Sequence, residues 1–371
     1  MNCCDHMEHE KQGDGPSSSP SRRHILGGAA MLAASALPIS RGLGQVPGAG
    51  PKAGGKIDIH HHILPPNILP HPGAPAVQGP HSPYPAWSPQ IAIDEMDRND
   101  VATGISSTGT IPNLLNMETE ARRSAIRKWN EYGTRLGSDH PGRFGLFAPL
   151  PLPDVEGSLK EIEYALGTLK ADGVGILTSY GDLWLGDPKL RPVFEELNRR
   201  KALVFVHTTD ASCCTQMSYM TPPANTSWIE WPMNTARCIY SLMANGVFRD
   251  LPDVRFIFAH GGGVMPLLIA RLRGMRKTTT LDPADYDRVF PNGVDAEFKK
   301  LRFEIAQAFD QVNYDALSAL VPTSNILYGS DFPWFDVSAS RDGFAALGIS
   351  PETRHAISRG NAELLMPRWK A

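Results

Sequence analysis

The chain has 371 residues, of which 42% are hydrophobic and 20% charged, and its formal net charge is −3. This composition is that of a folded globular protein, and the small negative charge offers no basic surface for nucleic acid or an anionic membrane. Outside the N-terminal segment no apolar run is long enough to cross a bilayer, so we expect no membrane span.

The first 44 residues have the pattern of an export signal. Ser21-Arg22-Arg23 precedes a short apolar run at 27–37, which is too short and too rich in glycine and alanine for a stable transmembrane helix. A twin arginine before such a run predicts export by the twin-arginine route to the periplasm or beyond. The alternative is a disordered basic tail. Residues 45–55 are rich in proline and glycine and are interpreted as a linker.

After the linker, eight short apolar or β-branched runs alternate with helical patterns, which is typical of parallel βα units. The runs are 56–61, 102–107, 144–148, 173–178, 203–207, 254–259, 301–305 and 325–328. Ser88-Pro89 and Asp187-Pro188 each have the pattern of a helix start. No Gly-x-Gly-x-x-Gly follows the first run, which disfavours a dinucleotide-binding sheet. The sequence therefore predicts an α/β protein, with residues 56–371 forming a single (β/α)₈ TIM-type barrel.

Three histidines follow one another at the end of the first predicted strand. Because side chains alternate along a strand, Asp58, His60 and His62 are expected on one face and His61 on the other. Two inward imidazoles can bind one metal ion, and Asp58 would orient one of them through a hydrogen bond. A His-x-His pair by itself is weak evidence, because a lone histidine is more often a packing residue.

Three later strands also end in polar residues. His207 closes the fifth strand, His260 follows the sixth, and Asp331 follows the eighth. The carboxyl ends of barrel strands meet at one face, so we expect these side chains to gather there. Imidazoles with one carboxylate suit zinc, with manganese as the alternative. The fourth strand, 173–178, has no lysine to bridge two metals, so a single divalent ion is predicted.

These segments resemble the amidohydrolase superfamily. Residues 56–65, 258–263 and 329–333 are similar to the branch that contains α-amino-β-carboxymuconate-ε-semialdehyde decarboxylase. Residues 144–200 are closer to its 6-methylsalicylate decarboxylase-like members. The resemblance implies metal ligation by His60, His62, His207 and Asp331, with His260 unligated and catalytic together with Asp331. It also places Arg271 near the substrate carboxylate or at a subunit contact, in a family whose members are often dimers; the alternative for Arg271 is a salt bridge on a helix surface.

The chain departs from this branch in two places. Residues 66–87 contain no arginine, although the muconate-semialdehyde enzyme has a substrate-binding arginine there, so a different substrate is expected. Glu304 stands where relatives often have aspartate, and it would either line the pocket or pair with Arg302. Aromatic walls could come from tryptophans that are equally well explained as loop packing: Trp228, Trp231 and Trp334.

The leading functional hypothesis is non-oxidative decarboxylation of a salicylate-type aromatic carboxylate. Loss of CO₂ from an aromatic ring needs a proton delivered to the ring carbon, a role assigned to Asp331, with His260 stabilising charge on the substrate. The same residues could instead hydrolyse a lactone, amide or ester through a metal-activated water. A third possibility is a non-catalytic barrel that binds aromatic compounds.

Overall fold

The computed structural model describes residues 54–65, 86–107, 116–214 and 226–370, which belong to one compact unit. The predicted export signal, the linker up to residue 53, and most of the arginine-free segment at 66–87 lie outside the described residues. Within the described ranges, no helix combines the length and the apolar character that a membrane span requires.

Eight parallel strands make up the main sheet, in the order in which they occur in the chain. They are β1 (Lys56–His61), β2 (Val101–Ser106), β3 (Phe144–Pro149), β4 (Gly173–Leu177), β7 (Leu203–His207), β8 (Arg255–Phe258), β9 (Arg302–Glu304) and β10 (Ile326–Leu327). Backbone hydrogen bonds join the first and last strands, from Ile59 N to Tyr328 O at 3.0 Å and from Asp331 N to His60 O at 2.7 Å. The sheet thereby closes into a barrel.

The predicted strands are confirmed, each within one residue of the observed ends. A short antiparallel pair, β5 (Ser179–Tyr180) and β6 (Leu183–Trp184), was not predicted. The predicted helix starts also hold. Ser88 Oγ accepts the Ile91 amide at the first turn of α1, and Asp187 caps a single 3₁₀ turn directly before α4.

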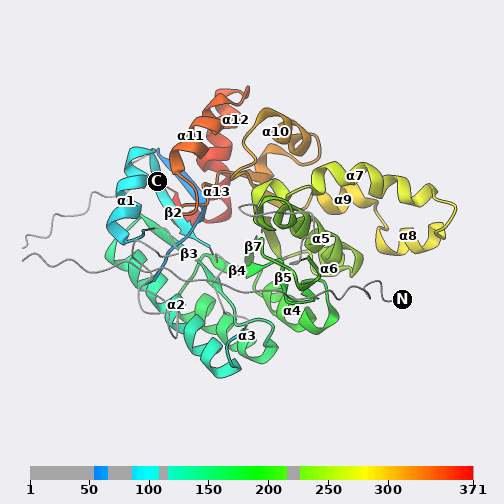
Figure 1. The fold of residues 1–371 in the computed structure, drawn as a ribbon, viewed down its shortest axis with the longest axis horizontal. Coiled ribbons are helices and arrows are strands. Elements are labelled where there is room, and N and C mark those ends of the chain that lie inside the picture. Colours follow the sequence, from blue (N-terminus) through cyan, green and yellow to red (C-terminus); the bar gives the residue numbers. More distant parts are fainter. Residues whose placement is uncertain (1–53, 66–85, 108–115, 215–225, 371) are drawn as a thin grey trace, which may run out of the picture. The chain divides into compact units, whose positions relative to one another are not determined.

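Helices connect the strands and surround the sheet (Figure 1). The first seven are α1 (Pro89–Arg98), α2 (Thr119–Asp139), α3 (Val155–Ile162), α4 (Arg191–Arg199), α5 (Glu230–Ala244), α6 (Val247–Asp250) and α7 (Met265–Gly274). The others are α8 (Pro283–Val289), α9 (Val294–Phe298), α10 (Gln311–Ser318), α11 (Val337–Ala346), α12 (Pro351–His355) and α13 (Asn361–Leu365). A large apolar cluster packs between strands and helices.

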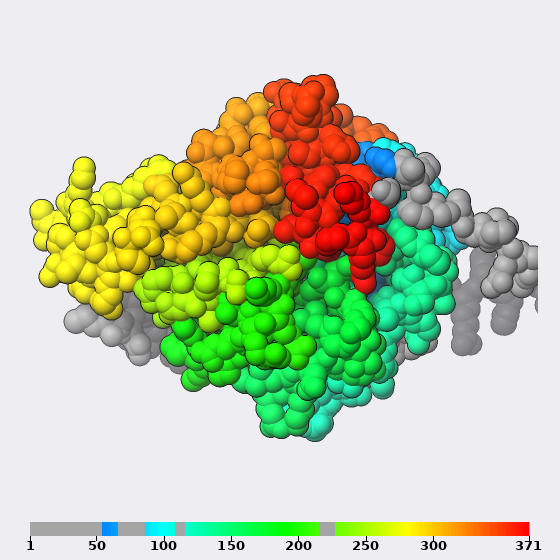
Figure 2. All heavy atoms as spheres, turned by 180° about the vertical axis from the view of Figure 1, so that it is seen from behind, coloured from blue at the N-terminus to red at the C-terminus, as the bar shows by residue number. Residues whose placement is uncertain are grey.

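A second apolar cluster fills the interior of the barrel. Its members come from six strands and from the C-terminal segment: Ile57, Ile59, Ile105, Phe147, Leu203, Phe205, Ile257, Ala259, Leu327, Ala362 and Met366. Met366 follows α13, and Figure 2 shows the C-terminal segment, in red, over the middle of the face seen from behind. The apolar interior therefore leaves the carboxyl ends of the strands as the place for polar side chains.

Candidate metal centre

Four buried side chains from three strand ends converge at the carboxyl face of the barrel. His60 and His62 come from the end of β1, His207 from the end of β7, and Asp331 from the turn after β10. One ligand atom from each lies within 4.8 Å of the others. Asp331 Oδ1 is 3.2 Å from His60 Nε2 and 2.9 Å from His62 Nε2, and these two nitrogens are 3.1 Å apart. The structure thus brings together the four residues predicted to bind a metal.

The expectation for Asp58 has to be corrected. Its carboxylate contacts neither ring of the predicted ligands; Oδ2 lies 3.1 Å from Nδ1 of His61, and Oδ1 accepts the amides of His60 and Ser330. The reason is a register irregularity in β1 between Asp58 and His61. Simple alternation fails there, because Ile59 belongs to the interior cluster and His60 also points inward. Asp58 and His61 therefore share the other side.

Each of the three imidazoles has its Nδ1 atom against an oxygen that accepts a hydrogen bond. These contacts are His60 to Glu304 Oε1 at 2.7 Å, His62 to Ser107 O at 3.2 Å, and His207 to Thr208 O at 2.6 Å. Carbonyl and carboxylate oxygens can only accept, so the Nδ1 atoms carry the protons. The Nε2 atoms then face the centre of the cluster, where a metal ion would take their lone pairs in place of a proton, as in metal sites whose ligand histidines are oriented by such acceptors.

The electrostatics of the cluster call for a cation at its centre. The Nε2 atom of His207 is buried and has no hydrogen-bond partner among the described residues. Burial, reinforced by the neighbouring imidazoles, holds the pKa of His207 well below its usual value. Burial alone would also lower the pKa of His60, but Glu304 and Asp331 outweigh it and raise that pKa to about 10. Three nitrogen donors, one of which has no partner among the described residues, and one carboxylate fit a divalent metal ion.

Asp331 is suited to the role of an ionised ligand. Burial would raise its pKa, but the charge and hydrogen bonds of His60 and His62 outweigh burial and hold it well below its usual value. Its backbone has φ of +66°, a left-handed conformation that is uncommon outside glycine and asparagine. Such conformations occur often at functional sites. Because its lowered pKa keeps the Asp331 carboxylate ionised, this residue can donate a proton only after it has accepted one.

His260 stands beside the cluster without belonging to its four ligands. Its ring centroid is 4.9 Å from that of His60, and its Nδ1 donates to Ala306 O at 3.1 Å. Its Nε2 is left for a ligand or substrate. With φ of +55°, it is the second left-handed residue at the site. The position agrees with the acid–base or charge-stabilising role predicted for it, which stays a prediction.

Glu304 is the residue that the sequence placed least well. It does not pair with Arg302; it is fully buried, and its carboxylate accepts hydrogen bonds from the His60 ring and from the amides of His260 and Ala306. Each of these contacts measures 2.7 Å. One carboxylate therefore fixes both a predicted metal ligand and the predicted acid–base histidine. Its position at the end of β9 was the only signal in the sequence.

We predict that Glu304→Gln weakens metal binding by about 10- to 100-fold, as is typical when a hydrogen-bond partner of a ligand histidine is altered. Glutamine keeps the shape but removes the charge that holds the Nδ1 proton of His60. Titration of the metal into chelator-treated protein measures the effect. Glu156→Gln, a change on α3 at an exposed pair with Lys160, is the control and should leave the affinity unchanged.

The predicted substrate-binding residues are less closely grouped. Arg271 is exposed on α7, Trp228 is 62% exposed, and Trp334 is 38% exposed. Trp334 is tied to the site by its amide, which donates to Asp331 O at 3.0 Å. Trp231 lies nearest, with its ring 6.2 Å from that of His207 and its Nε1 bonded to Asp210. Trp231 is therefore the best placed of the three tryptophans to form an aromatic wall.

Comparison with known proteins identifies the family. The model of the amidohydrolase family matches residues 57–368, which span the whole barrel and all the residues of the cluster. The chain belongs to the amidohydrolase family. Within this family it is similar to decarboxylase yanB of Aspergillus niger, with 32% identity over 85% of this chain and 88% of the relative. It is also 32% identical to 6-methylsalicylic acid decarboxylase of Penicillium expansum, over 85% of this chain and 97% of the relative.

Solved structures of amidohydrolases share the fold. A 2,6-dihydroxybenzoate decarboxylase in complex with 2,6-dihydroxybenzoate aligns with a TM-score of 0.72 at 21% identity, over 85% of this chain and 99% of that one. A dihydroxybenzoic acid decarboxylase from Polaromonas sp. JS666, solved with manganese and the inhibitor 2-nitroresorcinol, aligns with a TM-score of 0.67 at 19% identity. That alignment covers 85% of this chain and 98% of the other.

Proposed function

We propose that this amidohydrolase is a metal-dependent carboxy-lyase that removes the carboxylate from a salicylate-type aromatic acid without oxidation. The observation behind the proposal is the convergence of three Nε2 atoms and Asp331 on one point, with the ring of His260 beside it. Relatives that share about a third of its sequence over nearly its whole barrel are decarboxylases, two of them of 6-methylsalicylic acid.

His60, His62, His207 and Asp331 would hold the metal ion, which supplies a Lewis acid able to hold a carboxylate and a neighbouring phenolic oxygen. Asp331 is buried and its carboxylate is ionised, and it would accept the phenolic proton of a substrate held beside it. It then returns this proton to the ring carbon that bears the carboxylate. The bond to the carboxylate breaks, CO₂ leaves, and the bonding electrons restore the aromatic ring as a phenolate. One proton moves within the site and none is lost.

His260 would act on the substrate through its Nε2 atom. In its protonated form it donates to the carboxylate or phenolic oxygen and so stabilises negative charge where it develops. The hydrogen bond from Nδ1 to Ala306 O, together with the Glu304 contact to the His260 amide, fixes the ring. The ring of Trp231 lies on the side of His207, where it can pack against an aromatic substrate.

This proposal predicts a dependence on the position of the phenolic hydroxyl. CO₂ release should be measured from 2-hydroxybenzoates, including 6-methylsalicylate, and from the 3- and 4-hydroxy isomers. The 2-hydroxy acids are expected to react at least about a hundredfold faster, because only they place a proton donor next to the carboxylate. A panel of lactones and esters tests the rival hydrolase. Turnover of that panel without CO₂ release from any acid would exclude the decarboxylase.

For the metal we propose zinc, with manganese as the alternative. Three imidazoles and one carboxylate are a common zinc donor set, whereas manganese prefers more oxygen ligands. Manganese is present in the related Polaromonas structure. Elemental analysis of protein purified without added metal decides between them, since each ion has its own mass signal.

We further propose that the chain is exported and acts as a homodimer. Export rests on the twin arginine at 22–23, and fractionation of cells producing the chain tests it.

A dimer would cover large apolar side chains that are exposed on neighbouring helices, including Tyr240 on α5 and Leu267 on α7. Sedimentation velocity tests it, and a monomer at micromolar concentration would contradict it.

A further inference from the structure

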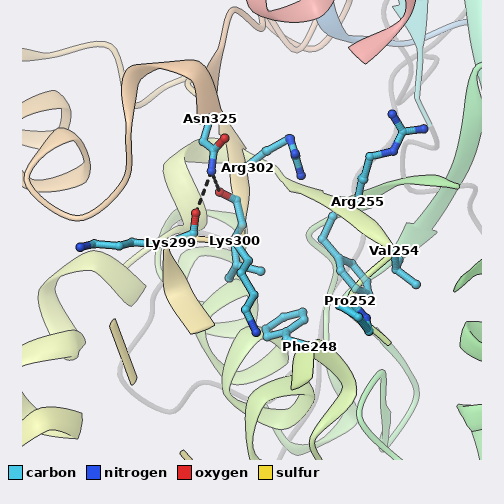
Figure 3. A pocket seen from close by; sticks show the side chains of 10 residues that line it. Phe248, Pro252, Val254, Arg255, Lys299, Lys300, Arg302 and Asn325 are labelled. Carbon is cyan, nitrogen blue, oxygen red and sulfur yellow. Dashed lines mark hydrogen bonds between the residues drawn. The ribbon is translucent and has the colours of Figure 1, made fainter. Parts of the chain in front are cut away.

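A second polar site lies at the opposite end of the barrel from the metal centre. A cavity of about 290 Å³ opens between the amino ends of β8 and β9. Four of the residues that line it are cationic, namely Arg255, Lys299, Lys300 and Arg302, and none is acidic. Figure 3 shows the guanidinium groups of Arg255 and Arg302 extending to the same side, from neighbouring strands, with Lys299 directed away from them.

The two arginines have no acidic partner among the described residues. Arg255 donates two hydrogen bonds, from Nε at 3.2 Å and from Nη2 at 2.8 Å, and both are accepted by the carbonyl oxygen of Lys201. No hydrogen bond or ion pair of the Arg302 side chain occurs within the described ranges. Lys300 is bonded to Glu297 at 2.8 Å, but that carboxylate does not line the cavity. The charge of the arginines is therefore left uncompensated.

Both arginines are also partly buried, which makes an uncompensated charge costly. Burial lowers the pKa of Arg255, and burial together with repulsion from Arg255 lowers the pKa of Arg302. Two other arginines of comparable or greater exposure do have acidic partners: Arg273 bonds Asp295, and Arg276 bonds Asp287. If this cavity had only a structural role, apolar residues in place of the two arginines, or an acidic residue beside them, would make the fold more stable.

We propose that this cavity is a binding site for a phosphate-sized oxyanion, carried either as free phosphate or as a phosphate ester. Guanidinium groups from two adjacent strands can donate several N–H hydrogen bonds to the oxygens of one phosphate-sized anion. Phe248 and Pro252 add an apolar wall that would accept an organic group attached to the phosphate. The anion would compensate both guanidinium charges at once.

The site is separate from the metal centre but shares two strands with it. His260 follows the carboxyl end of β8 and Glu304 ends β9, whereas Arg255 and Arg302 begin these strands. Arg255 lies five residues before His260 and Arg302 two residues before Glu304, which at about 3.3 Å per residue corresponds to roughly 16 and 7 Å along the two strands. An anion in the cavity therefore does not contact the metal ligands. Substitution of the arginines can then distinguish phosphate bound in the cavity from phosphate bound at the metal centre.

Isothermal titration of inorganic phosphate, and separately of phenyl phosphate, into the metal-loaded protein tests the site. Wild type is expected to bind both, and Arg302→Gln and Arg255→Gln are expected to weaken both by tenfold or more. Arg98→Gln, at an exposed pair with Glu95 on α1, is the matched control and should change neither affinity. Binding of phosphate alone would identify free phosphate as the ligand, and tighter binding of phenyl phosphate a phosphate ester.

The midpoint of thermal unfolding, measured with and without phosphate, distinguishes a loss of phosphate binding from a folding defect. Without phosphate, Arg302→Gln should unfold at the same temperature as wild type or higher, because the variant removes a repulsive charge. With phosphate, only wild type and Arg98→Gln should be stabilised. Equal phosphate affinity in wild type and both cavity variants would overturn the proposal, as would stabilisation by sodium chloride equal to that by phosphate at matched ionic strength.

Discussion

Replacement of His207 with alanine is expected to remove the bound metal and to lower the rate of CO₂ release by about a thousandfold or more. The buried Nε2 atom of this residue has no hydrogen-bond partner among the described residues, so its lone pair is available to coordinate the metal. A Lewis acid contributes several kcal/mol to such a reaction, and about 4 kcal/mol corresponds to a thousandfold in rate. Elemental analysis and a CO₂ assay on the same preparation measure both effects.

The control for this variant is His355→Ala, which removes an exposed imidazole on α12. It should bind the same amount of metal as wild type and release CO₂ at the same rate. The same protocol applied to His62→Ala should reproduce the loss seen with His207→Ala. Full metal occupancy in either ligand variant would show that the cluster does not hold the ion.

The second large effect is expected at His260. His260→Gln should lower kcat for CO₂ release by about 10²- to 10⁴-fold, the range for loss of an acid–base group, while leaving the metal content unchanged. The separation follows from the geometry, because the ring lies beside the four ligands and its Nδ1 is bonded to Ala306 O. Metal loss in this variant would mean that His260 is a ligand rather than a catalytic group.

The parts of the site that the sequence predicted are those fixed by regular strand geometry. Apolar runs of four to six residues define the strands, and polar residues at the end of such a run or within three residues after it lie at the carboxyl face of a parallel barrel. His207, His260 and Asp331 satisfy this rule. Their approach to one another then follows from barrel closure, even though Asp331 and His62 are 269 residues apart in the chain.

The residues that the sequence misplaced depend on local irregularities and on contacts between distant loops. Asp58 was misplaced because the register irregularity in β1 changes which side chains point inward, and no residue type in this segment predicts such an irregularity. Glu304 was identified as a pocket or pairing residue, but its contact to the His260 amide spans 44 positions. Likewise, only the folded chain distinguishes Trp231, near His207, from the exposed Trp228.

One divalent metal ion, held by His60, His62, His207 and Asp331, is proposed to support decarboxylation. This proposal is tested most directly by adding metal back to chelator-treated protein while CO₂ release from 6-methylsalicylate is measured. Release of CO₂ should be negligible without metal and should rise to a plateau at one equivalent of metal per chain. Undiminished release from metal-free protein, or a plateau only at two equivalents, would contradict the proposal.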